Sequence, residues 1–340
     1  MGSLTDNDPA DGPWATESWV LPVEDAYPEP LRAPFAVFDG FRPAQEAEAM
    51  RGHVDAHFAR PHAQRAETHQ IWNYWYVPGL YTYLRTEPER VIPHDLVAGF
   101  HDALREWASE RLGLAHVSWP VLSLYVDGCG QTIHNDSANG RFGYVYSLTR
   151  DHRQSRGGET LIFKEGDPFR SRLSEADAGQ GLYDLVPPLF NRLVIFDDRM
   201  PHSVQRIEGS MDPLDGRFVL HGHISEESPI VRGPLPPETV HAALGPVLKA
   251  SLDAFADTEH LHHGPLTIRI EIAPDGRVAD CRVLVDRVAR RDGGSPEALV
   301  ARIVGAFSTT RFPRADAVTT AILPILTGGL LPLAAERMGG

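Results

Sequence analysis

The chain has 340 residues, of which 42% are hydrophobic and 23% are charged, a composition typical of a soluble globular protein with one large and one smaller domain. Its formal net charge of −14 argues against nucleic acid and anionic membranes as partners, and no apolar run approaches the roughly 20 residues of a membrane span. The two cysteines, Cys129 and Cys281, are too few for a disulfide framework or a zinc site and favour a reducing, cytoplasmic compartment.

The first residues of the chain are expected to form a flexible tail. Residues 1–30 lack the basic region and the apolar stretch of a secretory signal. After them, residues 43–59 carry Ala, Met, Val and Phe at helical spacing, which predicts an amphipathic helix. This helix contains the pair His53 and Asp55. Side chains two residues apart on a helix point about 200° away from each other, so this pair cannot bind one metal ion together.

Residues 67–85 concentrate aromatic side chains in one short segment. Two interpretations stay open: packing against the core, or a substrate-facing lid, because aromatic side chains bury a large area and offer a polar tip. Residues 93–113 follow with the pattern of an amphipathic helix that supports a sheet. The candidate substrate-binding residues are Trp72, Tyr74, Trp75 and, further along the chain, Arg141.

His134 and Asp136 repeat the H-x-D spacing in a different setting. In residues 123–137, β-branched and aromatic residues lead into a Gly-rich turn. If the chain is extended at this point, His134 and Asp136 share one face and both reach a metal ion. Three more strands are predicted. The first covers 141–148, the second follows a Gly-Gly turn within 157–163, and the third covers 192–196 and is followed by His202.

Two imidazoles and one carboxylate are the ligands that bind Fe(II) on one face and leave the opposite face open. A further strand is expected from Arg217, on which Arg217, Val219, His221 and His223 share one face and apolar residues share the other. An arginine there can hold the remote carboxylate of an organic acid in a bidentate pair. The alternative, Arg206, follows His202 too closely to reach across a pocket. We interpret the two histidines of this strand as a solvated or pocket-rim face rather than as extra ligands.

These motifs, in this order, resemble the prolyl-4-hydroxylase-like branch of the Fe(II)/2-oxoglutarate dioxygenases over roughly residues 34–225. The resemblance rests on the tyrosine-bearing strand, HND, GGE, NRLVIFD with PHSV, and GRFVLHGHI. It implies a mainly β fold with flanking helices around a double-stranded β-helix (jelly roll), in a domain covering residues 31–228. The gap between the second histidine and the arginine is longer than is usual in the family, which a loop tolerates. The implied roles are Fe(II) ligands for His134, Asp136 and His202, 2-oxoglutarate binding for Arg217 and Tyr125, and possible stimulation by ascorbate.

The reaction implied by the resemblance is hydroxylation of an unactivated C–H bond, with release of succinate and CO2. The substrate is of amino-acid type, either free, peptidyl or carrier-bound. Asp136 favours this outcome over halogenation, because halogenating relatives have a small residue at that position. Alternatives remain open: desaturation, cyclisation or epimerisation with the same cofactors, a metal-dependent hydrolase or isomerase, and a catalytically idle binding protein.

The C-terminal part begins at a Pro-rich stretch, residues 228–238. Residues 229–263 are predicted to form a linker and a helix, and the cluster from His260 to His263 at its end is interpreted as structural, since cations suit a helix C-terminus. Residues 264–340 predict a small α+β domain with a hairpin at the PDG turn, a helix and a strand. This order resembles the TonB C-terminal domain over roughly residues 264–328. It indicates an interaction module, with a homodimer through this domain as one possible assembly.

Overall fold

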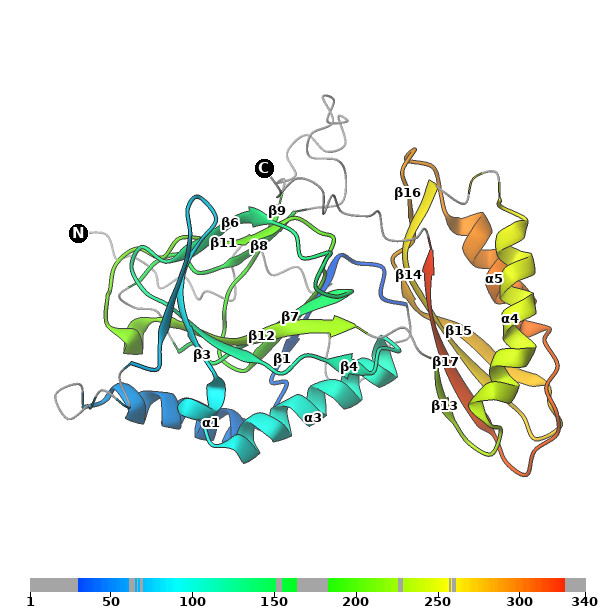
Figure 1. Cartoon of the computed structure of the whole chain (residues 1–340), viewed down its shortest axis with the longest axis horizontal. Helices are drawn as coiled ribbons and strands as arrows, with labels where there is room; N and C mark the ends of the chain where they lie inside the picture. The colour runs from blue at the N-terminus through cyan, green and yellow to red at the C-terminus, as the bar shows by residue number, and fades with distance from the viewer. Residues whose placement is uncertain are drawn as a thin grey trace, which may run out of the picture. The chain divides into compact units, whose positions relative to one another are not determined.

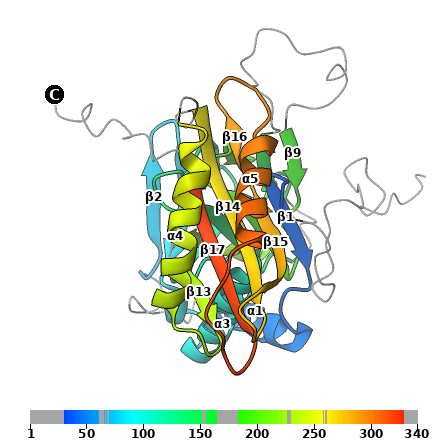
Figure 2. The same cartoon turned by 90° about the vertical axis from the view of Figure 1, so that its right-hand side faces the viewer.

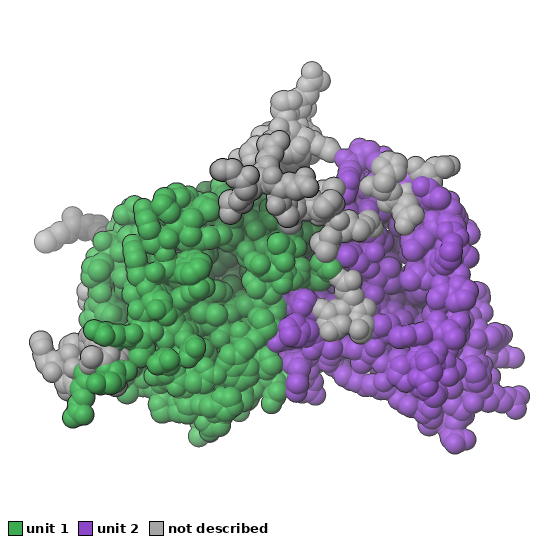
Figure 3. All heavy atoms as spheres, viewed as in Figure 1, with its two compact units in different colours: residues 1–25, 34–102, 118–223 green, residues 26–33, 103–117, 224–340 purple. Residues whose placement is uncertain are grey.

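The computed structural model describes residues 30–60, 65, 67, 70–150, 155–163, 183–225, 229–256, 258 and 261–327. Within these, the chain forms two compact units (Figure 3). Unit 1 holds residues 34–102 and 118–223, and unit 2 holds residues 30–33, 103–117 and those from 224 on. Apart from Pro30, the expected N-terminal tail lies outside the described residues. None of the described helices is both long enough and apolar enough to span a bilayer.

Unit 1 consists mainly of strands, with helices beside them (Figure 1). The helices predicted at 43–59 and 93–113 are confirmed, as are the strands predicted between residues 123 and 224. Helix α3 begins in unit 1 and ends in unit 2, and β12 also crosses the division. The elements are β1 (Phe35–Asp39), α1 (Ala44–Phe58), β2 (Asn73–Val77), β3 (Tyr81–Thr86), η3 (Pro88–Arg90), α3 (His94–Arg111), β5 (Val121–Tyr125), β6 (Gly130–His134), β7 (Phe142–Ser147), β8 (Thr160–Phe163), β9 (Tyr183–Val186), β10 (Arg192–Asp197), β11 (His202–Val204), η4 (Pro213–Asp215) and β12 (Arg217–Ser225).

The strands of unit 1 form two antiparallel layers. One layer has the order β1-β10-β7-β12-β5 and the other has the order β6-β11-β8-β9. From β5 to β8 each strand lies in the layer opposite to the strand before it, and from β9 to β12 the same alternation repeats. This succession is a jelly roll. Strand β3 joins the layers, because its end at Thr86 pairs with β5 while its start at Tyr81 pairs with β6. The predicted fold class, mainly β with a jelly-roll core and flanking helices, is confirmed.

Apolar side chains fill one end of the space between the layers. Helices α1 and α3 lie along the outer face of the layer that contains β7 and β12 (Figure 1). On that outer face, Phe100 of α3 stacks on Tyr146 of β7 with 4.7 Å between ring centroids. The opposite faces of the same strands turn inward. At the filled end the inward side chains are Phe35, Val37, Ile162, Val186, Val194 and Phe196, all of them buried.

Unit 2 is an antiparallel sheet with two helices on one face (Figure 2). The strand order is β13-β17-β14-β15, and β16 pairs with β14. The hairpin, helix and strand predicted beyond residue 264 are confirmed. The resemblance to the TonB C-terminal domain stays a prediction. The elements are β4 (His116–Val117), β13 (Ile230–Arg232), α4 (Pro237–Asp253), β14 (His262–Ile272), β15 (Val278–Asp286), β16 (Ala289–Arg290), α5 (Glu297–Ser308) and β17 (Thr319–Thr327).

The helix predicted within residues 229–263 is α4, but the described stretch around it is part of the core of unit 2 and not a linker. Leu235, Val240 and Leu244 are buried in the same cluster as the inward side chains of β14 and α5. Proline enrichment was misleading here because Pro236 and Pro237 stand at the start of α4, where a missing backbone N–H is tolerated. The helix therefore packs on the sheet as a structural member of the unit.

The histidine cluster is structural where it is described, but for a different reason from the one expected. His262 and His263 begin strand β14 instead of ending a helix, so the helix-dipole explanation is wrong. His262 is buried, and its Nδ1 lies 3.1 Å from the carbonyl oxygen of Thr258. His260 lies outside the described residues.

Candidate metal centre

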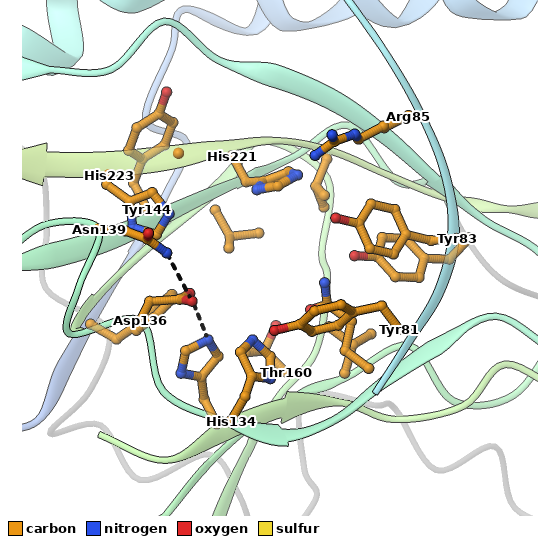
Figure 4. A pocket seen from close by; sticks show the side chains of 18 of the residues that line it. Tyr81, Tyr83, Arg85, His134, Asp136, Asn139, Tyr144, Thr160, His221 and His223 are labelled. Atoms are coloured by element: carbon orange, nitrogen blue, oxygen red, sulfur yellow. Dashed lines mark hydrogen bonds and ion pairs between the residues drawn. The ribbon is translucent and has the colours of Figure 1, made fainter. Parts of the chain in front are cut away.

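The two strands β6 and β11 bring His134 and His202 together. His134 is the last residue of β6, His202 is the first of β11, and the two are register partners in the antiparallel pair. Their ring centroids are 4.4 Å apart. Asp136 follows β6 in a turn that is fixed by a 2.8 Å hydrogen bond from its backbone N–H to the carbonyl of Asp198. Its Oδ2 lies 3.3 Å from Nε2 of His202. Figure 4 shows Asp136 and His134 on the same side of the pocket.

The three side chains offer one ligand atom each, within 4.8 Å of one another. The sequence placed His134 and Asp136 on one extended strand, whereas Asp136 lies just beyond the strand end. Asn139 holds the carboxylate there, because its Nδ2 donates to Oδ1 of Asp136 at 3.2 Å. The spacing of two residues still brings both groups to one point, because their ligand atoms lie within 4.8 Å of each other.

Hydrogen bonds fix the tautomer of both imidazoles. Nδ1 of His134 lies 2.7 Å from the carbonyl oxygen of Thr132, and Nδ1 of His202 lies 3.0 Å from that of Met200. A carbonyl oxygen only accepts, so each Nδ1 carries the proton and each Nε2 keeps its lone pair. Neutral imidazoles anchored in this way are the usual form of a histidine metal ligand.

The surroundings of His134 and Asp136 favour the protonation states that a divalent cation requires. Burial and the neighbouring His202 lower the pKa of His134. Burial tends to raise the pKa of Asp136, but the surrounding histidines, His202 first and then His134 and His223, more than offset it, so this pKa lies below its usual value. Neutral imidazole and ionised carboxylate need no deprotonation before they bind a metal.

Arg217 lies in the same pocket, at the start of β12. Its side chain is 1% exposed, and Nη2 donates to the hydroxyl of Thr160 at 3.3 Å. Its guanidinium carbon lies 4.8 Å from the ring centroid of Tyr125. Nε and Nη1 are buried and have no hydrogen-bond partner in the described part of the chain. Burial lowers the pKa of Arg217, but an arginine stays charged at neutral pH.

The Gly-Gly turn of the GGE motif allows this close packing. Gly158 has a φ of 88°, which favours glycine, and a Cβ there would lie 3.3 Å from Cδ of Arg217. The turn thus brings backbone to the arginine without adding a hydrogen-bond partner. A buried N–H group of a cation that has no acceptor is costly. We therefore expect an anion from outside the chain to bind here.

Strand β3, at the end of the aromatic segment 67–85, supplies pocket residues that were not among the candidate substrate-binding residues. Tyr81, Tyr83 and Arg85 alternate along β3 and all line the pocket. Tyr83 stacks on Tyr125 with ring centroids 5.0 Å apart, and burial raises the pKa of both phenols. The alternating pattern was visible in the sequence, but it does not tell which face of a strand turns inward.

The remaining polar residues of β12 also face the pocket. His221 and His223 line it, so the expectation of a pocket-rim face fits them and that of a solvated face does not. His221 accepts or donates a 2.8 Å hydrogen bond with Ser123, and burial lowers its pKa to about 3. Nδ1 of His223 lies 3.2 Å from Oδ2 of Asp198, a buried carboxyl whose pKa burial raises to about 6. Asp198 was missed because it stands next to Asp197 in a motif that carries two carboxylates.

The structure does not bring Trp72, Tyr74 or Arg141 into the pocket. Trp72 packs on Phe58 of α1 with ring centroids 5.7 Å apart, as the core-packing interpretation expected. Tyr74 is 62% exposed, on the face of β2 opposite to that of Trp75. Trp75 lies beside the pocket, because its ring covers the guanidinium of a pocket residue of β3.

The structure also shows where the two alternative candidates lie, the His53 and Asp55 pair and Arg206. His53 and Asp55 lie on α1, where Asp55 pairs with Arg51 and Arg150. Arg206 does not line the pocket that contains Arg217. Neither alternative therefore contributes to the metal-binding group.

No protein-family model matches the chain, and no curated protein matches its sequence. Several solved structures resemble it at low identity. A prolyl-4-hydroxylase from Pseudomonas putida is 18% identical, with 59% of this chain and 94% of that chain covered and a TM-score of 0.39. AviO1 from Streptomyces viridochromogenes is 17% identical, with 60% of this chain and 94% of that chain covered and a TM-score of 0.41. A prolyl hydroxylase from Trichoplax adhaerens, in complex with a hypoxia inducible factor peptide, is 15% identical, with 56% of this chain and 82% of that chain covered and a TM-score of 0.40. Likeness at this level does not assign a reaction or a substrate.

Proposed function

We propose that this protein is an Fe(II)- and 2-oxoglutarate-dependent oxygenase that hydroxylates a C–H bond of an amino-acid-type substrate, with release of succinate and CO2. One observation carries the proposal. Arg217, a buried arginine whose Nε and Nη1 have no hydrogen-bond partner among the described residues, lies in the same pocket as three side chains that offer a His-Asp-His ligand set. The pocket therefore suits a molecule that has an anionic group at one end and metal-binding atoms at the other.

The donor set fits Fe(II). Two imidazole nitrogens and one carboxylate oxygen leave several coordination positions open, as in non-haem iron oxygenases. The pocket beside the three side chains gives a co-substrate and dioxygen access to those positions. His134, Asp136 and His202 would hold the metal, each oriented by a hydrogen bond or turn of the jelly roll.

The far end of the pocket fits the distal carboxylate of 2-oxoglutarate. A carboxylate bound there accepts from Nε and Nη1 of Arg217, which removes the cost of leaving them unpaired. The hydroxyl groups of Thr160 and Tyr125 stand next to the guanidinium. Because Tyr125 keeps its proton, it can donate to the same carboxylate.

When bound, Fe(II) and 2-oxoglutarate supply the oxidation of a C–H bond at the expense of dioxygen. The chain supplies position and exclusion of water. Phe196, Val204 and Val219 line the pocket with apolar surface, while Arg217 fixes the co-substrate relative to the metal ligands. Asp136 would supply a carboxylate to the metal, which supports hydroxylation over halogenation.

A hydrolase or isomerase with another divalent metal also uses such a ligand set. The unpartnered N–H groups of Arg217 favour the oxygenase, because hydrolysis by a metal-bound water has no need of a second, anionic ligand. Desaturation, cyclisation and epimerisation share the cofactors, and only products distinguish them. The two free cysteines are compatible with the proposed cytoplasmic location.

The test is binding and turnover with a matched control. Anaerobic addition of Fe(II) and then 2-oxoglutarate is followed by visible absorption, and succinate release is measured in air with ascorbate and an amino-acid and peptide panel. We expect His134→Ala to lose both signals. His53→Ala removes the histidine of the other H-x-D pair, on α1, and should leave both unchanged. Full succinate release by His134→Ala would overturn the proposal.

A further inference from the structure

We propose that Arg85 binds a carboxylate of the substrate, so that the substrate is a free carboxylic acid of amino-acid type rather than a peptidyl or carrier-bound residue. This inference rests on the proposed function and names the substrate class of the same pocket. It concerns a residue that neither the sequence motifs nor the co-substrate site includes.

Arg85 points into the pocket from strand β3. It pairs in register with Ser123 of β5, whose hydroxyl bonds His221, so its side chain lies on the inward face of the sheet. Figure 4 shows the guanidinium directed toward His221, on the side of the pocket away from His134. Arg85 is therefore separate from the metal ligands and available to a molecule bound beside them.

The guanidinium is held in place but lacks a counter-charge. Its carbon lies 3.6 Å from the ring centroid of Trp75, a cation–π contact that covers one face of the group, and it bonds the hydroxyl of Tyr83. Within the described residues no Asp or Glu pairs with Arg85. By contrast, Arg192 is paired with Asp39, and Arg199 with Asp197. A stacked guanidinium keeps its rigid fork of N–H donors free at the edge, where a carboxylate binds bidentately.

Among the Arg, Asp and Glu side chains that line the pocket, Arg85 is the one without a counter-charge there. Glu159, whose charge acts on Arg217, does not line the pocket. The double positive charge of Fe(II) and the double negative charge of 2-oxoglutarate cancel, and Asp136 and Arg217 cancel each other. His223 and Asp198 form a pair with no net charge, and His221 is neutral because burial lowers its pKa to about 3. Among the charged residues that line the pocket, the positive charge of Arg85 is thus left over. A half-buried cation without a partner is unfavourable, and one carboxylate would compensate it.

The uncompensated positive charge of Arg85 distinguishes a free amino-acid substrate from a peptidyl or carrier-bound one. The α-carboxylate of a free amino acid carries the single negative charge that is missing. A peptidyl residue presents a neutral amide at the same position, and a carrier-bound residue presents a neutral thioester. Neither form satisfies the fork of Arg85, so both would leave the cation unpaired.

The test compares free amino acids with their carboxamides, which differ only in this charge. With Fe(II) and 2-oxoglutarate, we expect wild-type kcat/KM for the acid to exceed that for the amide by on the order of 10- to 100-fold, the range of a charged hydrogen bond. Arg85→Gln should lower the value for the acid and leave that for the amide, so that the ratio falls to about one. Arg85→Lys should restore part of the preference, because it restores the charge without the fork.

Controls separate this inference from the proposed function. Arg90→Gln removes an exposed arginine of the same region, paired with Glu87, and should leave the acid-to-amide ratio unchanged. If wild type and Arg85→Gln bind 2-oxoglutarate equally but no acid is preferred to its amide, the inference fails and the oxygenase assignment stands. If Arg85→Gln loses affinity for 2-oxoglutarate, Arg85 belongs to the co-substrate site and the inference is also overturned. Absence of any 2-oxoglutarate binding by wild type would instead reject the proposed function.

Discussion

A buried arginine lies on each face of strand β12, and the two arginines differ in what compensates their charge and N–H groups. On the inward face Arg217 is buried in the pocket, and on the outward face Phe218 packs on Arg51 of α1, with 5.1 Å from the guanidinium carbon to the ring centroid. Both arginines are 1% exposed. Burial of a cation is unfavourable by several kcal/mol unless hydrogen bonds and a counter-charge compensate it. The difference lies in where the compensation comes from.

Arg51 is satisfied entirely by the chain. Its Nε donates to Oδ1 of Asp55 at 2.6 Å, Nη1 donates to the carbonyl of Leu148 at 2.9 Å, and Nη2 donates to that of Leu214 at 3.0 Å. Arg217 donates to Thr160 and also interacts with Tyr125, but its Nε and Nη1 have no hydrogen-bond partner among the described residues. An internally satisfied arginine joins segments of the fold. An unsatisfied one is maintained for a ligand.

The largest effect that tests this comparison is on the outward face. Arg51→Met removes three charged hydrogen bonds and leaves two carbonyl oxygens without a donor, so we expect the free energy of unfolding to fall by about 3 kcal/mol. Urea titration measures this change. Arg150→Met is the matched control, because Arg150 pairs with the same Asp55 from the surface and should cost less than about 1 kcal/mol. Equal effects of the two substitutions would contradict the structural role of Arg51.

The next effect concerns the ligand expected on the inward face. With Fe(II) present, 2-oxoglutarate at 100 times its Kd should stabilise the wild-type protein by about 2.7 kcal/mol, because it binds only the folded state. In Arg217→Met this stabilisation should disappear at the same concentration. Thermal unfolding with and without 2-oxoglutarate measures it. Arg206→Met, a substitution outside the pocket, should keep the full effect. A stabilisation that survives in Arg217→Met would place the distal carboxylate elsewhere.

A smaller effect is expected without any ligand. Because Nε and Nη1 of Arg217 have no partner, replacing this arginine by methionine should leave the unfolding free energy of the ligand-free protein unchanged or raise it by up to about 2 kcal/mol. Replacement of arginine by methionine is thus expected to destabilise the ligand-free protein at Arg51 but not at Arg217. Urea titration in the absence of 2-oxoglutarate gives the sign. A clear loss of stability would mean that the chain itself, rather than a ligand, satisfies Arg217.

The sequence predicted the parts of the site that are close together along the chain. The setting of the two H-x-D pairs, with His134 at the end of a strand and His53 and Asp55 on a helix, was sufficient to choose between two motifs of identical spacing. The alternation along residues 217–224 correctly separated an inward polar face from an outward apolar one. Local periodicity carries this information, because a strand or a helix fixes where each side chain points.

What the sequence did not reveal depends on contacts between distant segments. Arg85 enters the pocket only because β3 joins the two layers of the jelly roll, which no pattern within residues 81–86 indicates. Asp198 and Asp197 are adjacent carboxyls, and only the fold shows that Asp198 meets His223. The Pro-rich stretch before α4 likewise reads as a linker until its apolar residues are seen in the core of unit 2. Strand pairing and burial decide these cases.

The smallest expected effect concerns Trp75 of β2, which lies beside the pocket. Trp75 covers one side of the Arg85 guanidinium but forms no hydrogen bond with a ligand in the proposed arrangement. Trp75→Leu removes a cation–π contact of about 0.5–1 kcal/mol and should raise KM for an acidic substrate only about two- to fivefold, with kcat nearly unchanged. Tyr74→Leu changes an exposed ring on the opposite face of β2 and should leave KM as it is. Steady-state kinetics of both variants measures the difference. If Tyr74→Leu matched or exceeded Trp75→Leu, the aromatic hairpin would bind substrate through its outer face, and the arrangement proposed for Arg85 would have to be abandoned.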